Sequence, residues 1–156
     1  MHRIFIETTP ERISQAITDP AWNGRYGYGG RAAYDRSPGG SYRSFASEAM
    51  EQASTEMGFP QPPEVVVDEV VLADPPSQLV QTWQMLVAPH HGGRGVQRRL
   101  TYDICRLTVT HELGGMPALD QVVRGSGELG APGGGGWDRV LSDLKTLLET
   151  GSGFAG

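Results

Sequence analysis

Three polar side chains, Gln81, Tyr102 and His111, are the best candidates for chemistry in this chain. Each belongs to a strand-like stretch in which residues two apart share one face and are otherwise apolar. An imidazole can orient a ligand or exchange a proton, and an amide or a phenol can fix a bound molecule by hydrogen bonds. A few polar groups on an apolar wall are the usual composition of a small-molecule pocket.

The sequence leaves two interpretations of His111 open. It can act on a ligand as an acid, a base or a hydrogen-bond partner, or it can be a structural histidine that bonds to the backbone. Its neighbour Glu112 points to the opposite face of the strand, so the two residues do not form a ready dyad. The structural interpretation is the more common one for a lone histidine.

Other reactive side chains lack the partners that catalysis or metal binding requires. The adjacent histidines His90 and His91 have no third ligand nearby, and Cys105 is interpreted as a buried thiol. Ser41 and Ser142 lie in no nucleophile-elbow setting. We therefore predict no catalytic residue, no metal site and no cofactor.

The element that must position these groups is an amphipathic helix at Trp137–Thr150. Its apolar residues recur at the spacing of one buried face. They are Trp137, Val140, Leu141, Leu144, Leu147 and Leu148. Such a helix needs a partner surface, and the chain's own sheet is the large one available.

Three strand-like stretches precede this helix: Leu79–Val87, Arg99–Ile104 and Arg106–Leu113. If their apolar faces look toward the helix, the enclosed space is a candidate ligand site. The expected lining residues are Tyr26, Tyr28, Gln81, Trp83, Tyr102, His111 and Trp137. The alternative is a filled core in which Trp83 and Trp137 pack together.

The first half of the chain predicts a strand, a short helix and further strands. The strand is expected at Arg3–Thr8, and Thr9-Pro10-Glu11 is a helix start that Asp19-Pro20 ends. Alternate tyrosines suggest a strand within Trp22–Tyr34. The remaining signals are a hairpin at Ser37-Pro38-Gly39-Gly40, a short helix within Ala46–Met57 and a β-branched strand at Val65–Leu72.

Composition excludes several classes of protein. The 156 residues predict one domain, 1–156, and the net charge of −5 argues against nucleic-acid binding. The single cysteine predicts a reducing compartment, and no segment resembles a signal peptide or a membrane span. We expect a soluble cytoplasmic protein that is a monomer or weak dimer, with no membrane partner.

The order of these elements, and the words within them, resembles the SRPBCC (START-related, helix-grip) superfamily. The branch it is most similar to contains homologues of the activator of the heat-shock-protein-90 ATPase. The matching words include Ile6-Glu7-Thr8-Thr9-Pro10-Glu11, Pro38-Gly39-Gly40-Ser41-Tyr42, Asp74-Pro75-Pro76, Leu79-Val80-Gln81-Thr82-Trp83, Leu107-Thr108-Val109-Thr110-His111-Glu112 and Gly136-Trp137. The resemblance implies an α+β helix-grip fold, a curved antiparallel sheet wrapped around a long C-terminal helix.

Fold does not fix function, and the superfamily contains several functions. We expect the binding of a small hydrophobic or amphipathic molecule between the sheet and the helix. One alternative, implied by the branch, is a chaperone cofactor or other protein-binding module. Another is a cavity enzyme such as a cyclase or hydrolase.

Overall fold

The structure is a computed structural model, and it describes residues 1–27, 29–56, 58, 63–84, 86, 98–104, 107–112, 120, 123–125 and 135–154. The predictions for Tyr28, His90, His91 and Cys105 lie outside these residues.

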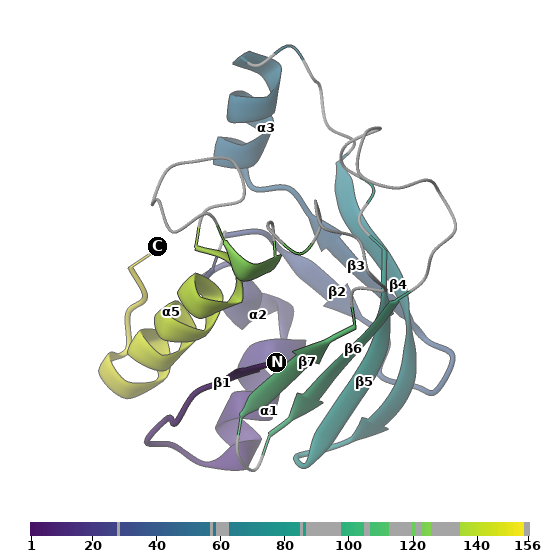
Figure 1. Ribbon diagram of the computed structural model, residues 1–156, viewed down its shortest axis with the longest axis vertical. Helices are drawn as coiled ribbons and strands as arrows, with labels where there is room; N and C mark the ends of the chain where they lie inside the picture. The colour runs from purple at the N-terminus through teal and green to yellow at the C-terminus, as the bar shows by residue number, and fades with distance from the viewer. Residues whose placement is uncertain are drawn as a thin grey trace.

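The described strands form one antiparallel sheet of seven strands in the order β1-β7-β6-β5-β4-β3-β2. The sheet is curved, and its strands run side by side across the molecule (Figure 1). Their bounds are β1 His2–Arg3, β2 Ala32–Tyr34, β3 Ser41–Phe45, β4 Glu64–Asp74, β5 Gln78–Trp83, β6 Arg98–Asp103 and β7 Thr108–His111.

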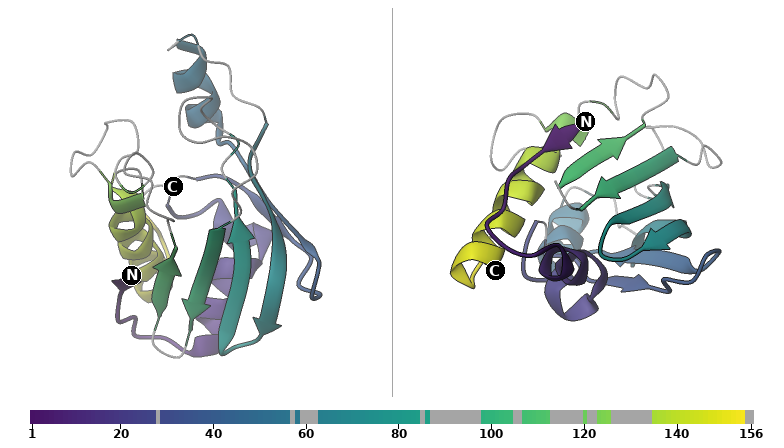
Figure 2. Two further views of the ribbon diagram at one scale, coloured as in Figure 1. Left: turned by 45° about the vertical axis from the view of Figure 1, so that its right-hand side comes forward. Right: turned by 90° about the horizontal axis from the view of Figure 1, so that it is seen from below.

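Four helices complete the described fold. They are α1 Pro10–Thr18, α2 Pro20–Asn23, α3 Glu48–Glu56 and α5 Gly136–Thr150. The views in Figure 2 show α5 and α1 on the inner side of the curved sheet, with α3 at one end of the molecule. None of the helices in the described ranges has both the length and the apolar character that crossing a bilayer requires.

The apolar stripe of α5 packs into the core as its spacing predicts. Leu141, Leu144 and Leu148 are buried together with inner-face residues of the sheet, among them Leu79, Leu100 and Val109. This arrangement confirms the predicted α+β fold with a curved antiparallel sheet against a C-terminal helix. It also fixes which face of each strand looks toward α5.

The start of α1 follows its capping signals. Thr9 Oγ1 accepts a hydrogen bond of 3.4 Å from the Arg12 backbone N–H, and Pro10 occupies the first turn. Asp19 ends α1 and caps α2, because its Oδ1 accepts a 2.9 Å hydrogen bond from the Ala21 N–H. The second helix was not predicted, although an aspartate before a proline is a strong helix start.

Two predicted strands are wrong in extent. The first strand covers His2–Arg3 instead of Arg3–Thr8, because the chain leaves the sheet after the bond from Ile4 N to Leu107 O at 3.1 Å. Among the described residues of Trp22–Tyr34, only the last three form a strand. Gly27 and Gly29 adopt φ values of 71° and 67°, which turn the chain there.

Candidate functional site

Four aromatic rings meet on the inner face of the sheet beneath the start of α5. The Trp83 and His111 ring centroids are 4.5 Å apart at an interplanar angle of 75°. The ring of Trp137 lies 5.9 Å from that of Tyr102 and 6.4 Å from that of His111. All three pairs are edge-to-face, a favourable geometry for aromatic rings. The structure thus brings together residues from β5, β6, β7 and α5.

His111 is held as a neutral, buried imidazole. It is 8% exposed, and burial, aided by the charge of Arg98, lowers its pKa to about 4. Its Nδ1 accepts a hydrogen bond of 3.4 Å from Trp137 Nε1, which can only donate. The ring proton therefore sits on Nε2. This buried Nε2–H has no hydrogen-bond partner among the described residues.

Gln81 presents a second buried donor. Its side chain is fully buried, and its Oε1 accepts a hydrogen bond of 3.2 Å from the Tyr34 hydroxyl. The amide Nε2 has no partner in the described part of the chain. A buried polar group without a partner costs free energy.

The two donors lie in one row across the sheet but do not touch. Leu100 of β6 is opposite Gln81 on one side and opposite His111 on the other. Gln81 and His111 are therefore two strand spacings apart, roughly 9–10 Å. Tyr102 lies one row away, opposite Leu79 and Val109. The three polar groups span a surface and do not converge on one atom.

Tyr26 belongs to the opposite wall. It packs against the core from the turn after α2, and its hydroxyl donates a 3.3 Å hydrogen bond to the Ala16 carbonyl of α1. Burial raises the pKa of its phenol well above the usual value. Tyr26 closes the apolar interior on the side of α1 and makes no hydrogen bond to Gln81 or His111 in the described structure.

The sequence analysis missed a second polar row on the same face. Tyr34, Tyr42 and Asp68 stand opposite one another on β2, β3 and β4, and the two tyrosine ring centroids are 4.5 Å apart. Burial raises the pKa of Tyr42 to about 12 and raises that of Tyr34 well above its usual value. Both phenols are therefore neutral hydrogen-bonding groups near neutral pH.

Asp68 is the unusual member of this row. It is 7% exposed, its Oδ1 accepts a hydrogen bond of 3.1 Å from Thr82 Oγ1, and its Oδ2 has no partner among the described residues. Burial raises its pKa to about 7, and hydrogen bonds from Thr82 and the Gln84 backbone offset only part of that rise. One signal could have found it, since Val66, Asp68 and Val70 share one face of a β-branched strand.

A separate small cavity of about 170 Å³ lies below the N-terminal segment. It is lined by Ile4, Phe5, Ile6, Thr8, Pro10, Ile13, Ile104 and Leu107. Its volume is below the range of about 300–1,000 Å³ that small-molecule sites occupy. It does not include the aromatic cluster, and we do not place the candidate site there.

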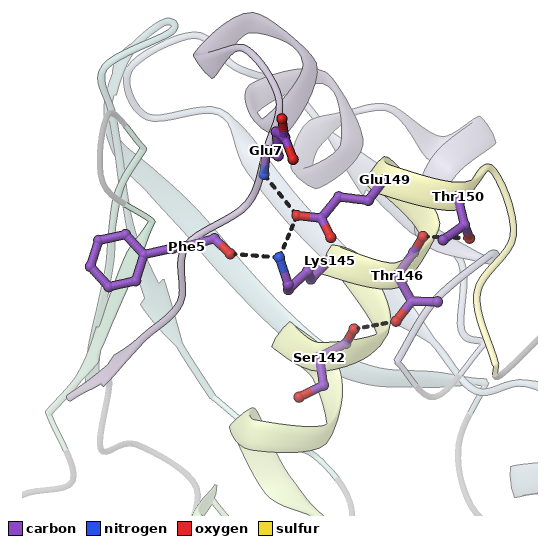
Figure 3. Close-up of polar contacts among 7 residues, drawn as sticks. All are labelled: Phe5, Glu7, Ser142, Lys145, Thr146, Glu149 and Thr150. Carbon is purple, nitrogen blue, oxygen red and sulfur yellow. Dashed lines mark hydrogen bonds and ion pairs between the residues drawn. The ribbon is translucent and has the colours of Figure 1, made fainter.

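Polar contacts from α5 hold the segment that covers this cavity (Figure 3). Lys145 Nζ donates to the Phe5 carbonyl at 3.0 Å, and Glu149 Oε1 accepts from the Glu7 N–H at 2.8 Å. Lys145 and Glu149 also pair with each other one helical turn apart.

No group of three or more potential metal ligands occurs among the described residues.

No protein-family model matches the chain, and neither does any curated protein. Solved structures do. A Mesorhizobium loti protein has a TM-score of 0.61 at 14% identity, covering 95% of this chain and 94% of its own. A Rhodobacter sphaeroides protein has a TM-score of 0.57 at 17% identity, and the match covers 94% of this chain and 89% of that protein. The Aha1 dimer from Colwellia psychrerythraea has a TM-score of 0.52 at 18% identity, and the match covers 97% of this chain and 96% of that protein. The chain therefore shares one fold, of the helix-grip type, with these proteins over nearly its whole length.

Proposed function

We propose that this protein binds a small hydrophobic or amphipathic molecule between the inner face of the sheet and α5. The observation that carries the proposal is the pair of buried donors without partners, Gln81 Nε2 and His111 Nε2, on an aromatic wall. An unpaired buried donor costs about 1–3 kcal/mol, which a ligand acceptor removes on binding.

The wall defines what the bound molecule contacts. Trp83, Tyr102 and Trp137 offer ring faces and edges to an apolar or aromatic body. The donors on β5 and β7 are positioned for acceptor oxygens of a carbonyl, ether or carboxylate group. The ligand we propose therefore has an apolar body and at least one acceptor.

The spacing of the polar groups favours binding over catalysis. A general acid or base must lie within hydrogen-bond reach of its partner or of the reacting atom. Leu100 separates Gln81 from His111, so these two cannot act on each other. A cavity enzyme therefore has less support than a carrier or sensor of a small molecule.

A protein-binding module is the second candidate, and an exposed edge favours it. Phe5 and Met1 flank β1, the edge strand of the sheet, and are 72% and 76% exposed. Exposed strand edges with apolar side chains are common pairing surfaces. One structural neighbour is a dimer of Aha1. Sedimentation velocity of the wild type and Phe5→Ser tests this candidate, because an edge-mediated dimer dissociates in the variant.

Two measurements test the small-molecule proposal. Native mass spectrometry of the purified protein should detect a co-purified small molecule. Titration with the neutral probe N-phenyl-1-naphthylamine should quench tryptophan emission, because Trp83 and Trp137 belong to the wall.

Tyr102→Glu should abolish probe binding, since it places a charge on the apolar inner wall. Thr101→Glu on the opposite face of the same strand is the matched control and should bind normally. His111→Gln should leave the neutral probe nearly unaffected and weaken a ligand that carries an acceptor. A folded wild type that carries no small molecule and binds no probe would contradict the proposal.

A further inference from the structure

We infer that the ligand carries a basic amine and that the buried carboxylate of Asp68, flanked by aromatic rings, is the group that receives it. This inference rests on the proposed function, because it assigns chemistry to one end of the same site. It goes further in stating the charge of the ligand and the direction in which it lies across the sheet.

Register places Asp68 on the inner face. It is opposite Tyr42 on β3, and two residues later Val70 is opposite Gln81 on β5. A hydrogen bond of 3.3 Å from the Val67 N–H to the Gln84 carbonyl continues that register. Asp68 therefore lies in register between Tyr42 of β3 and Trp83 of β5, and its carboxylate bonds to Thr82 beside Trp83.

This surrounding suits a protonated amine. A carboxylate oxygen accepts the N–H, and the faces of tyrosine and tryptophan rings attract a cation. The free acceptor is Asp68 Oδ2, since Oδ1 is already occupied by Thr82 Oγ1. A neutral alcohol could use the hydrogen bond but would gain nothing from the charge.

No lysine or arginine neutralises this carboxylate within the described part of the chain. The four ion pairs there are His2–Asp138, Arg43–Glu64, Arg124–Asp120 and Lys145–Glu149. A carboxylate that is 7% exposed and has no cationic partner among these residues is costly to keep ionised, although it accepts hydrogen bonds from Thr82 and the Gln84 backbone. A cationic ligand supplies the missing partner.

The charges facing the site give the ligand a direction. Arg98 lies opposite Trp83 on β6, and its charge acts on His111. The acceptor end of the ligand belongs near His111, and the amine end belongs near Asp68, on the β3–β4 side. The proposed ligand is thus an amine at one end, an apolar body in the middle and an acceptor at the other end.

Asp68 titrates between pH 6 and 8, because its pKa is about 7. His2, which pairs with Val109 on β7, and the N-terminal amine act on His111 at the other end of the site. Tyr34, Tyr42 and Tyr102 have pKa values raised by burial, and His111 titrates near 4. The ionised fraction of Asp68 rises from about one-tenth to about nine-tenths over this range.

The test is isothermal titration calorimetry with two matched probes, 2-(naphthalen-1-yl)ethylamine and 2-(naphthalen-1-yl)ethanol. We expect the wild type to bind the amine about tenfold more tightly than the alcohol at pH 8, the effect of one charge-assisted hydrogen bond. The preference should fall several-fold at pH 6. Asp68→Asn should bind both probes alike, and Asp138→Asn, the same charge change at the exposed start of α5, should retain the wild-type preference.

The outcomes separate this inference from the proposed function. Equal affinity of the wild type for amine and alcohol, unchanged in Asp68→Asn, overturns the amine subsite and leaves the small-molecule proposal intact. Failure of folded wild type to bind either probe overturns both. If Asp68→Asn does not fold, the wild-type pH series decides: an amine preference that is the same at pH 6 and pH 8 contradicts the role of Asp68.

Discussion

The indole Nε1 of Trp137 donates a hydrogen bond of 3.4 Å to Nδ1 of His111, joining the first turn of α5 to β7. Because an indole N–H can only donate, this contact selects the tautomer of His111 that carries its proton on Nε2. The same contact orients the ring for its edge-to-face packing with Trp83 at 4.5 Å. A helix residue thereby determines which ring nitrogen of a sheet residue carries the proton.

The first prediction concerns the pH dependence of stability that His111 produces. Its pKa is about 4 in the folded protein and 6.5 as the ordinary value, so below pH 6.5 the unfolded chain takes up a proton that the folded protein does not. The free energy of unfolding should therefore fall as pH drops from 6.5 toward 4, by up to about 3 kcal/mol.

Urea melts of the wild type and His111→Gln at pH 7 and pH 4.5 measure this effect. The free energy of unfolding of the wild type minus that of the variant should be about 2 kcal/mol larger at pH 7 than at pH 4.5. Taking the difference between the two proteins removes the contribution of shared carboxylates. The same advantage at both pH values would show that His111 is not a buried neutral imidazole.

The second prediction concerns Asp68, which should make the free energy of unfolding fall as pH rises, opposite to the effect of His111. Burial raises its pKa from 3.8 to about 7, so its contribution to stability is fully present below pH 3.8 and is lost as pH rises through 7. Asp68→Asn should therefore be more stable than the wild type at pH 8, by about 2–3 kcal/mol, and nearly equal to it at pH 4.

Thermal or urea melts at the two pH values check this prediction. Asp138→Asn is the control, since Asp138 is exposed and should give no gain that depends on burial. A loss of stability in Asp68→Asn at pH 8 would mean that the carboxylate is paired. A gain would fit a group kept for function at the expense of stability.

Local periodicity was enough to predict the helix stripe and the inner faces of three strands. Leu141, Leu144 and Leu148 follow from the 3.6-residue repeat, and Trp83, Tyr102 and His111 follow from the two-residue repeat of strands. Each inference needs only neighbours in sequence. The capping of α1 by Thr9 is local in the same way.

Contacts between distant segments could not be predicted from the same patterns. The Tyr34–Tyr42–Asp68 row depends on the register between three strands, which no local repeat specifies. Asp143 is not one of the apolar residues that form the stripe of α5, yet it is fully buried. Its partners are backbone N–H groups 116 and 11 residues away in sequence.

The third prediction concerns Asp143. Its two carboxylate oxygens accept hydrogen bonds from the Gly27 N–H at 2.8 Å and the Phe154 N–H at 2.6 Å, which ties both segments to α5. Asp143→Ala leaves the buried Gly27 N–H and the partly buried Phe154 N–H without this partner and should lower the free energy of unfolding by about 2–4 kcal/mol. Ser142→Ala, next to it on the exposed side, should change stability by less than about 0.5 kcal/mol.

Gly153→Ala tests the same contact from the other side. A Cβ at Gly153 would lie 2.6 Å from Asp143 Oδ1, closer than atoms pack, so the C-terminal segment must move away from α5. Urea melts should show that both variants are destabilised. Hydrogen-exchange measurements should show faster exchange of the Phe154 amide in both. Wild-type stability of Asp143→Ala would show that this buried carboxylate does not anchor the two segments.

The last prediction concerns the contacts of Lys145 and Glu149 with the N-terminal segment (Figure 3). Glu149 accepts from the Glu7 N–H at 2.8 Å, and this bond together with Lys145 lowers the pKa of the Glu149 carboxyl. Glu149→Ala removes the acceptor, and we expect hydrogen exchange of the Glu7 amide to speed up by about threefold to tenfold. Glu149→Gln keeps an acceptor oxygen and should exchange within about twofold of the wild type. The Val109 amide of the central sheet is the reference for global unfolding, and it should be unaffected by either change. If Glu7 and Val109 accelerated together in Glu149→Ala, the segment would open only with the whole protein, and these contacts would not control it locally.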